Sequence, residues 1–154
     1  TFAYIIYCLL FKVLKKLIEN KMDIAITVDK AWRELWEIRM EDPLQDAETM
    51  KIDKFGFVLD LGKKPSSYDE INGQYIGLIK ISNNFLPKIS QFYHNLDKQA
   101  LYEGQNYNNM YMTTFIQLVI DNLCSVNADI INGGWLEFDT VTDLNTYKSK
   151  KLSL

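Results

Sequence analysis

The 154-residue sequence is poor in the residues that build disulfide frameworks, zinc sites and histidine-dependent catalytic centres. Its two cysteines, Cys8 and Cys124, lie far apart in apolar surroundings, which argues against a disulfide or a zinc site. We expect both to be buried thiols in a reducing compartment, and hence a cytoplasmic protein. The single histidine, His94, lies among aromatic residues in a helical pattern and predicts packing rather than a catalytic triad.

Long apolar runs and early glycines are also missing. The nearly unbroken apolar run at residues 2–11 is shorter than the roughly 20 residues that a membrane-spanning helix needs. It also lacks the basic start of a signal peptide, so it predicts a buried strand and no membrane partner. Glycine first occurs at Gly56. Residue 1 is Thr, from which we expect the chain to begin inside a longer one.

Basic residues are not in excess, because 17 Lys and Arg stand against 20 Asp and Glu, for a net charge of -3. The lack of a basic footprint argues against nucleic acid as a partner and leaves open a local site for small anions. The hydrophobic content of 47% is that of an ordinary globular protein. The length suits one domain, which we place at residues 1–154, and nothing in the sequence indicates an oligomeric state.

What the sequence does contain is a regular succession of strand and helix patterns. Apolar residues that alternate or run together predict strands at 3–10, 22–28, 55–61, 75–81 and 125–131. Apolar residues at helical spacing predict helices at 13–20, 30–40, 85–101 and 112–123. The first strand, helix and strand are expected to form a βαβ unit within one sheet.

The segment at residues 133–140 carries a candidate metal site. If this segment is a strand, Glu137 and Asp139 lie on the same face, because side chains alternate along a strand. Two such carboxylates suit a hard divalent cation. Thr140 and Asp143 have the spacing of a helix capping box, so the carboxylates lie at the carboxyl end of a strand. The alternative role of Asp139 is a helix cap, and we prefer the metal because Thr140 already fills that position.

A stripe of aromatic and cationic residues follows the second strand. Trp32, Trp36 and Arg39 recur at helical spacing. Core packing is the preferred interpretation for the two tryptophans. The alternative is a substrate wall, in which tryptophan contacts a quaternary ammonium group and arginine binds a phosphate. Gly77 interrupts a later strand and would let a ligand or a backbone come close.

Five phrases in this order resemble the later part of nucleotidyltransferases. They are residues 23–32, Trp36 with Arg39, residues 46–48, residues 73–78, and residues 134–140 with Asp143 and Leu144. Together they are similar to the phosphocholine cytidylyltransferase-like branch of the sugar-phosphate nucleotidyltransferase superfamily. The resemblance extends from about residue 4 to residue 147.

The resemblance implies an incomplete Rossmann-like α/β/α fold, with a mixed, mostly parallel sheet flanked by helices. It implies Mg²⁺-dependent attack by a phosphomonoester, such as phosphocholine or a sugar phosphate, on a nucleoside triphosphate, with CTP expected and pyrophosphate released. By the same resemblance, Asp139 binds the metal and Glu137 is the adjacent catalytic carboxylate. Trp32, Trp36, Arg39 and Gly77 are the expected acceptor contacts.

Two departures from the family pattern set limits. The family's glycine-rich loop, which binds the triphosphate, has no counterpart before Gly56. The family's second metal-binding aspartate is also missing, since residues 7–11 contain no Asp. We therefore expect the C-terminal portion of such a domain, inactive alone, with an exposed sheet edge at residues 2–11. The alternatives are a catalytically dead binding or interaction module and an accidental resemblance.

Overall fold

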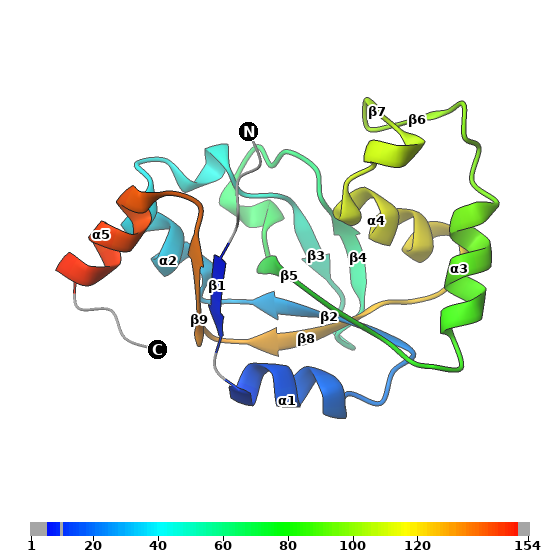
Figure 1. The fold of residues 1–154 in the computed structure, drawn as a ribbon, viewed down its shortest axis with the longest axis horizontal. Coiled ribbons are helices and arrows are strands. Elements are labelled where there is room, and N and C mark those ends of the chain that lie inside the picture. Colours follow the sequence, from blue (N-terminus) through cyan, green and yellow to red (C-terminus); the bar gives the residue numbers. More distant parts are fainter. Residues whose placement is uncertain (1–5, 10, 151–154) are drawn as a thin grey trace.

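The computed structural model describes residues 6–9 and 11–150, which form an α/β fold (Figure 1). The helices in these residues are α1 (Phe11–Glu19), α2 (Trp32–Arg39), α3 (Leu86–His94), α4 (Met112–Asn122) and α5 (Val141–Ser149). The strands are β1 (Ile6–Leu9), β2 (Ile24–Asp29), β3 (Met50–Ile52), β4 (Val58–Leu61), β5 (Gln74–Ile81), β6 (Leu101–Tyr102), β7 (Gln105–Asn106), β8 (Asn127–Ile131) and β9 (Trp135–Phe138). Short 3₁₀ helices cover Pro43–Gln45, Tyr68–Glu70 and Tyr107–Asn109.

The central sheet has the strand order β5-β2-β8. Strand β2 is antiparallel to β5 and parallel to β8, so the expected mixed sheet is confirmed. The β2–β8 ladder is the only parallel pairing between two strands of the described residues, so the sheet is less parallel than expected. Helices flank this sheet, and the β1–β9 pair stands beside the ends of β2 and β8 in Figure 1.

The predicted βαβ unit in one sheet is wrong. Strand β1 pairs antiparallel with β9, with Ile6 opposite Phe138 and Leu9 opposite Trp135. The physical reason is that β5 and β8 already occupy both edges of β2, which leaves no edge of that strand for β1. The predicted strand at 3–10 is confirmed for Ile6–Leu9, and the rest of that prediction lies outside the described residues.

The two faces of the central sheet differ in polarity. On one face, Ile24, Ile26 and Val28 of β2 enter an apolar core that includes residues of β4, α3, α4 and β8. Burying each such side chain stabilises the fold by about 1.5–3 kcal/mol. On the other face, Thr27 of β2 lies opposite Asp129 of β8, whose carboxylate is 3.8 Å from Lys16 Nζ of α1. Helix α1 also buries Val13 against Ile131 on this face, so the face is mixed in polarity, and the other face holds the larger core.

Helix α3 ends at His94, seven positions before the predicted end at residue 101. Asp97 Oδ1 accepts a hydrogen bond from the N–H of Gln99 at 2.8 Å, which turns the chain. The β6–β7 hairpin then forms around Glu103 and Gly104, whose φ angles are 50° and 81°. Local side-chain hydrogen bonding and a left-handed turn thus override the apolar periodicity.

No helix in the described residues has the length and apolar character needed to cross a bilayer. The longest of them, α4, has 11 residues.

Candidate active site

A single buried carboxylate holds the loop that leads into the acidic segment. Asp29, at the end of β2, is 1% exposed. Its Oδ1 accepts hydrogen bonds from the N–H groups of Ala31 at 2.9 Å and Gly133 at 2.8 Å. Its Oδ2 accepts one from Trp135 Nε1 at 2.8 Å. Asp29 therefore joins the end of β2, the start of α2 and the loop that leads into β9.

The predicted capping box follows β9 and is confirmed. Thr140 Oγ1 accepts a hydrogen bond from the N–H of Asp143 at 3.1 Å, and Asp143 Oδ2 accepts one from the N–H of Thr140 at 2.8 Å. Asp143 Oδ2 also accepts from the N–H of Asp139 at 3.0 Å. The strand thus ends at Phe138 and the helix begins at Val141, which holds Asp139 at the strand end.

Arg39, the last residue of α2, brings the two candidate carboxylates together. Its Nη1 donates to Glu137 Oε2 at 2.5 Å, and its Nη2 donates to Asp139 Oδ2. Its Nε lies 3.5 Å from Asp143 Oδ1. The Arg39 side chain is only 4% exposed, against 14% for Glu137 and 36% for Asp139. The guanidinium therefore contacts the carboxylates from the protein side, and the two carboxylates lie on the same side of the segment, as their spacing predicted.

Burial and charge act against each other in this cluster. Burial opposes the charge of Arg39, but the hydrogen bond and charge of Glu137 outweigh it and raise the pKa of Arg39, so it stays cationic. Burial raises the pKa of Glu137; the hydrogen bond from Arg39 offsets this only in part, and the charge of Asp139 adds to it. Burial also raises the pKa of Tyr147, whose hydroxyl donates to the carbonyl of Glu137, to about 12.

Asp143 is shifted in the opposite direction. Burial favours its neutral form, but the hydrogen bonds from Thr140 and the charge of Arg39 outweigh burial and hold the pKa of Asp143 below its usual value. Three acidic side chains thus share one guanidinium, and the cluster keeps an excess of negative charge. Such an excess favours the binding of a further cation.

The donor set of Glu137 and Asp139 fits Mg²⁺. Both supply hard oxygen atoms, and both already converge on a cation. No group of three or more His, Cys, Asp or Glu side chains in the described part of the chain is arranged to hold a metal. Two carboxylates are nevertheless enough for a magnesium site in which water and substrate phosphates supply the other oxygens.

The remaining sequence candidates do not contact the carboxylates, although the Trp36 ring lies 5.6 Å from the Arg39 guanidinium. Trp32 and Trp36 are 4% and 6% exposed and belong to a second core cluster. Trp36 Nε1 donates to Asp46 at 3.0 Å, and its ring lies 5.9 Å from that of Trp135. This is the core packing that the sequence favoured. Gly77 is exposed and has a φ of 82°, at a register shift of the β2–β5 ladder. The left-handed backbone at this bulge requires glycine.

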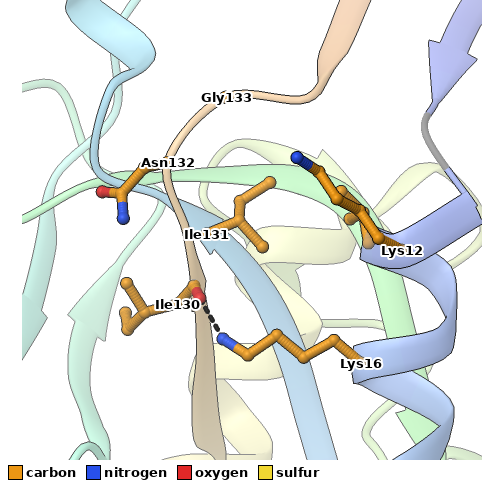
Figure 2. Close-up of a pocket in the computed structure, with 7 residues that line it drawn as sticks. Lys12, Lys16, Ile130, Ile131, Asn132 and Gly133 are labelled. Carbon is orange, nitrogen blue, oxygen red and sulfur yellow. Dashed lines mark hydrogen bonds between the residues drawn. The ribbon is translucent and has the colours of Figure 1, made fainter.

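Sequence reasoning missed a cationic pocket near the start of β9 (Figure 2). The pocket has a volume of about 330 Å³ and lies between the first turns of α1 and the loop after β8. Lys12 and Lys16 line one side, and Asn132 and Gly133 line the other. Lys16 Nζ donates to the carbonyl of Ile130. The signal in the sequence was the spacing of the two lysines, which places both on one helix face.

The fold is similar to that of a solved CTP transferase. It matches the solved structure of the inositol-1-phosphate CTP transferase from T. maritima with a TM-score of 0.61 and 17% identity. The match covers 94% of this chain and 50% of that chain. The α/β Rossmann-like class predicted from the sequence is therefore confirmed.

Sequence similarity indicates which kind of nucleotidyltransferase the chain resembles. The chain is 46% identical over 136 residues to the CTP:phosphoglutamine cytidylyltransferase of Campylobacter jejuni. The match covers 88% of this chain and 53% of the relative, so the chain spans about half the length of the curated relative it matches. No family model matches the chain. The resemblance stated from the sequence is confirmed: over most of its own length the chain is similar to a cytidylyltransferase.

The substitution Asp29→Asn tests the three hydrogen bonds that Asp29 accepts at the end of β2, which we call the Asp29 clamp. An asparagine Oδ1 can still accept from Ala31 and Gly133, but its amide N–H would face the indole N–H of Trp135. We expect a loss of about 2–3 kcal/mol in the free energy of unfolding, because a buried donor then faces a donor. Urea unfolding followed by circular dichroism measures the loss.

Asp53→Asn is the matched control. Both hydrogen bonds to Asp53, from the N–H groups of Phe55 and Phe57, go to Oδ1, which asparagine retains. We expect a change below about 0.5 kcal/mol. In Asp29→Asn, the added change Trp135→Phe should cost less than it does in the wild type, because it removes the opposing donor. Equal costs of Trp135→Phe in both backgrounds would contradict the clamp.

The substitution Asp143→Asn tests the charge of the capping residue. We expect a loss of about 1 kcal/mol at pH 7, because the cap weakens and Arg39 loses a carboxylate. The lowered pKa of Asp143 means that its carboxylate stabilises the fold fully above the unfolded-state value of about 3.9. This stability is lost as the pH falls through the folded-state pKa, so the difference between variant and wild type should shrink below about pH 4.

Urea unfolding between pH 7 and pH 3 measures this dependence. Glu34→Gln is the control, since Glu34 is an exposed carboxylate in the first turn of α2. A gap between wild type and Asp143→Asn that stays constant or widens on acidification would rule out the proposed charge effect.

Proposed function

We propose that this chain takes part in CTP-dependent cytidylyl transfer to a small phosphorylated acceptor, with release of pyrophosphate. The observation that carries the proposal is the convergence of Glu137 and Asp139 on one cationic position at the end of β9. Its support from outside the structure is the 46% identity to a CTP:phosphoglutamine cytidylyltransferase. Because the chain spans about half of that relative, the activity of the whole relative is an inference here.

In this proposal the side chains of the site have different roles. Asp139, with Glu137 beside it, would hold Mg²⁺, which neutralises phosphate charge and aligns the attacking and leaving oxygens. Asp29 fixes the loop before β9 and so sets the position of both carboxylates. The pocket lined by Lys12 and Lys16 offers a cationic surface for a substrate phosphate. It also includes Gly133, which lies two positions before the first residue of β9.

The acceptor class follows from the aromatic residues and the relative. Phosphocholine recognition through Trp32 and Trp36 requires open aromatic faces, and both rings are packed in the core. A phosphorylated amide such as phosphoglutamine therefore suits this chain better than phosphocholine or a sugar phosphate. The acceptor contacts predicted for Trp32, Trp36, Arg39 and Gly77 stay predictions.

The second candidate is a binding module without turnover. The observation that favours it is the ion pairing of both candidate metal ligands with Arg39, which offsets part of the charge that a metal would otherwise meet. In this form, the chain would bind CTP and Mg²⁺ and release no pyrophosphate. Localisation in a reducing compartment is part of the same proposal and rests on the composition alone.

Calorimetry and a pyrophosphate-release assay on the 154-residue chain separate these functions. We expect Mg²⁺-dependent binding of CTP, weakened about tenfold or more by Asp139→Asn because a metal ligand loses its charge. Asp69→Asn is the control, since Asp69 is exposed and its side chain has no hydrogen bond or ion pair in the described structure.

The outcomes are distinct. Pyrophosphate release with phosphoglutamine above that with phosphocholine supports the enzyme and its acceptor class. Mg²⁺-dependent binding without release supports the binding module. Absence of CTP binding in the presence of Mg²⁺, or equal binding by wild type and Asp139→Asn, would overturn both.

A further inference from the structure

Arg39 is more deeply buried than the carboxylates it contacts. Its side chain is 4% exposed, whereas that of Asp139 is 36% exposed. The guanidinium thus reaches Glu137 and Asp139 from within the protein, and Asp139 remains open to solvent. An ion from solution and the guanidinium would approach the same oxygen atoms from opposite sides.

One donor of Arg39 is not yet used. Its Nε is buried without a hydrogen-bond partner, 3.5 Å from Asp143 Oδ1. A buried N–H without an acceptor is destabilising, so a small shift toward Asp143 would be favourable if Glu137 and Asp139 were otherwise satisfied. Asp143 is held by the capping box and keeps its carboxylate beside the guanidinium in either position.

We propose that Arg39 is an internal counter-ion that competes with a divalent metal for Glu137 and Asp139 and shifts toward Asp143 when the metal binds. The proposal rests on the metal site of the proposed function. Without metal, the guanidinium relieves the repulsion between two carboxylates two residues apart. With metal, the same carboxylates must be released, so the apparent metal affinity is the intrinsic affinity multiplied by the fraction of chains in which Arg39 does not hold them.

The inference gives Arg39 a positioning role. It also explains why an arginine stands among candidate metal ligands, where its charge would otherwise repel the metal. The carboxylates are kept in place before the metal arrives, and the metal enters only by exchanging one cation for another.

Titration of the 154-residue chain with Mn²⁺, followed by calorimetry, tests the competition. We expect Arg39→Met to bind Mn²⁺ at least about tenfold more tightly than the wild type, because the internal competitor is gone. Arg33→Met is the matched control, because Arg33 lies on the same helix and pairs with the exposed Glu37 at 2.6 Å. The Mn²⁺ affinity of this variant should stay within about twofold of the wild type.

A second measurement covers the case in which Arg39→Met does not fold. In the wild type, the Nε–H resonance of Arg39 should shift on addition of Mg²⁺, while that of Arg33 should not. Equal Mn²⁺ affinity of wild type and Arg39→Met, or saturation with Mg²⁺ at an unchanged Arg39 resonance, would overturn the competition and leave the metal site standing. No Mn²⁺ binding by the wild type and no Mg²⁺-induced shift would overturn the metal site itself.

Discussion

The buried carboxylate of Asp29 is the constraint on which the candidate site depends. It links the end of β2 to the start of α2 and to Trp135, which is 106 positions away in the sequence. A charged group at this depth is stable only when its lone pairs are occupied, and three donors occupy them here. The central sheet and the acidic strand β9 are therefore held in one fixed relation, and α2 delivers Arg39 to the same place.

Charge compensation is the second level of organisation. Glu137 and Asp139 lie close enough to repel each other, and a single guanidinium from the end of α2 contacts both. The raised pKa of Glu137 reflects its burial and shows that the arginine offsets only part of that penalty. The carboxylate oxygens that Arg39 contacts are those that a metal would need.

Sequence patterns predicted the contacts between residues that are close in the sequence and missed those between residues that are far apart in it. The Thr140 and Asp143 capping box and the shared face of Glu137 and Asp139 follow from spacings of two or three residues, and the structure has both. The pairing of β1 with β9 and the contact of Arg39 with Glu137, 98 positions apart, depend on how the sheets assemble. Periodicity carries no information on such pairings, so the expected βαβ unit was wrong.

The most direct test of the account is a crystal structure of the 154-residue chain soaked with Mn²⁺, in which anomalous scattering locates the metal. We expect a peak in contact with Asp139 and Glu137, and a guanidinium of Arg39 displaced toward Asp143. A metal bound elsewhere, or an acidic cluster without a peak and with Arg39 still on both carboxylates, would contradict it.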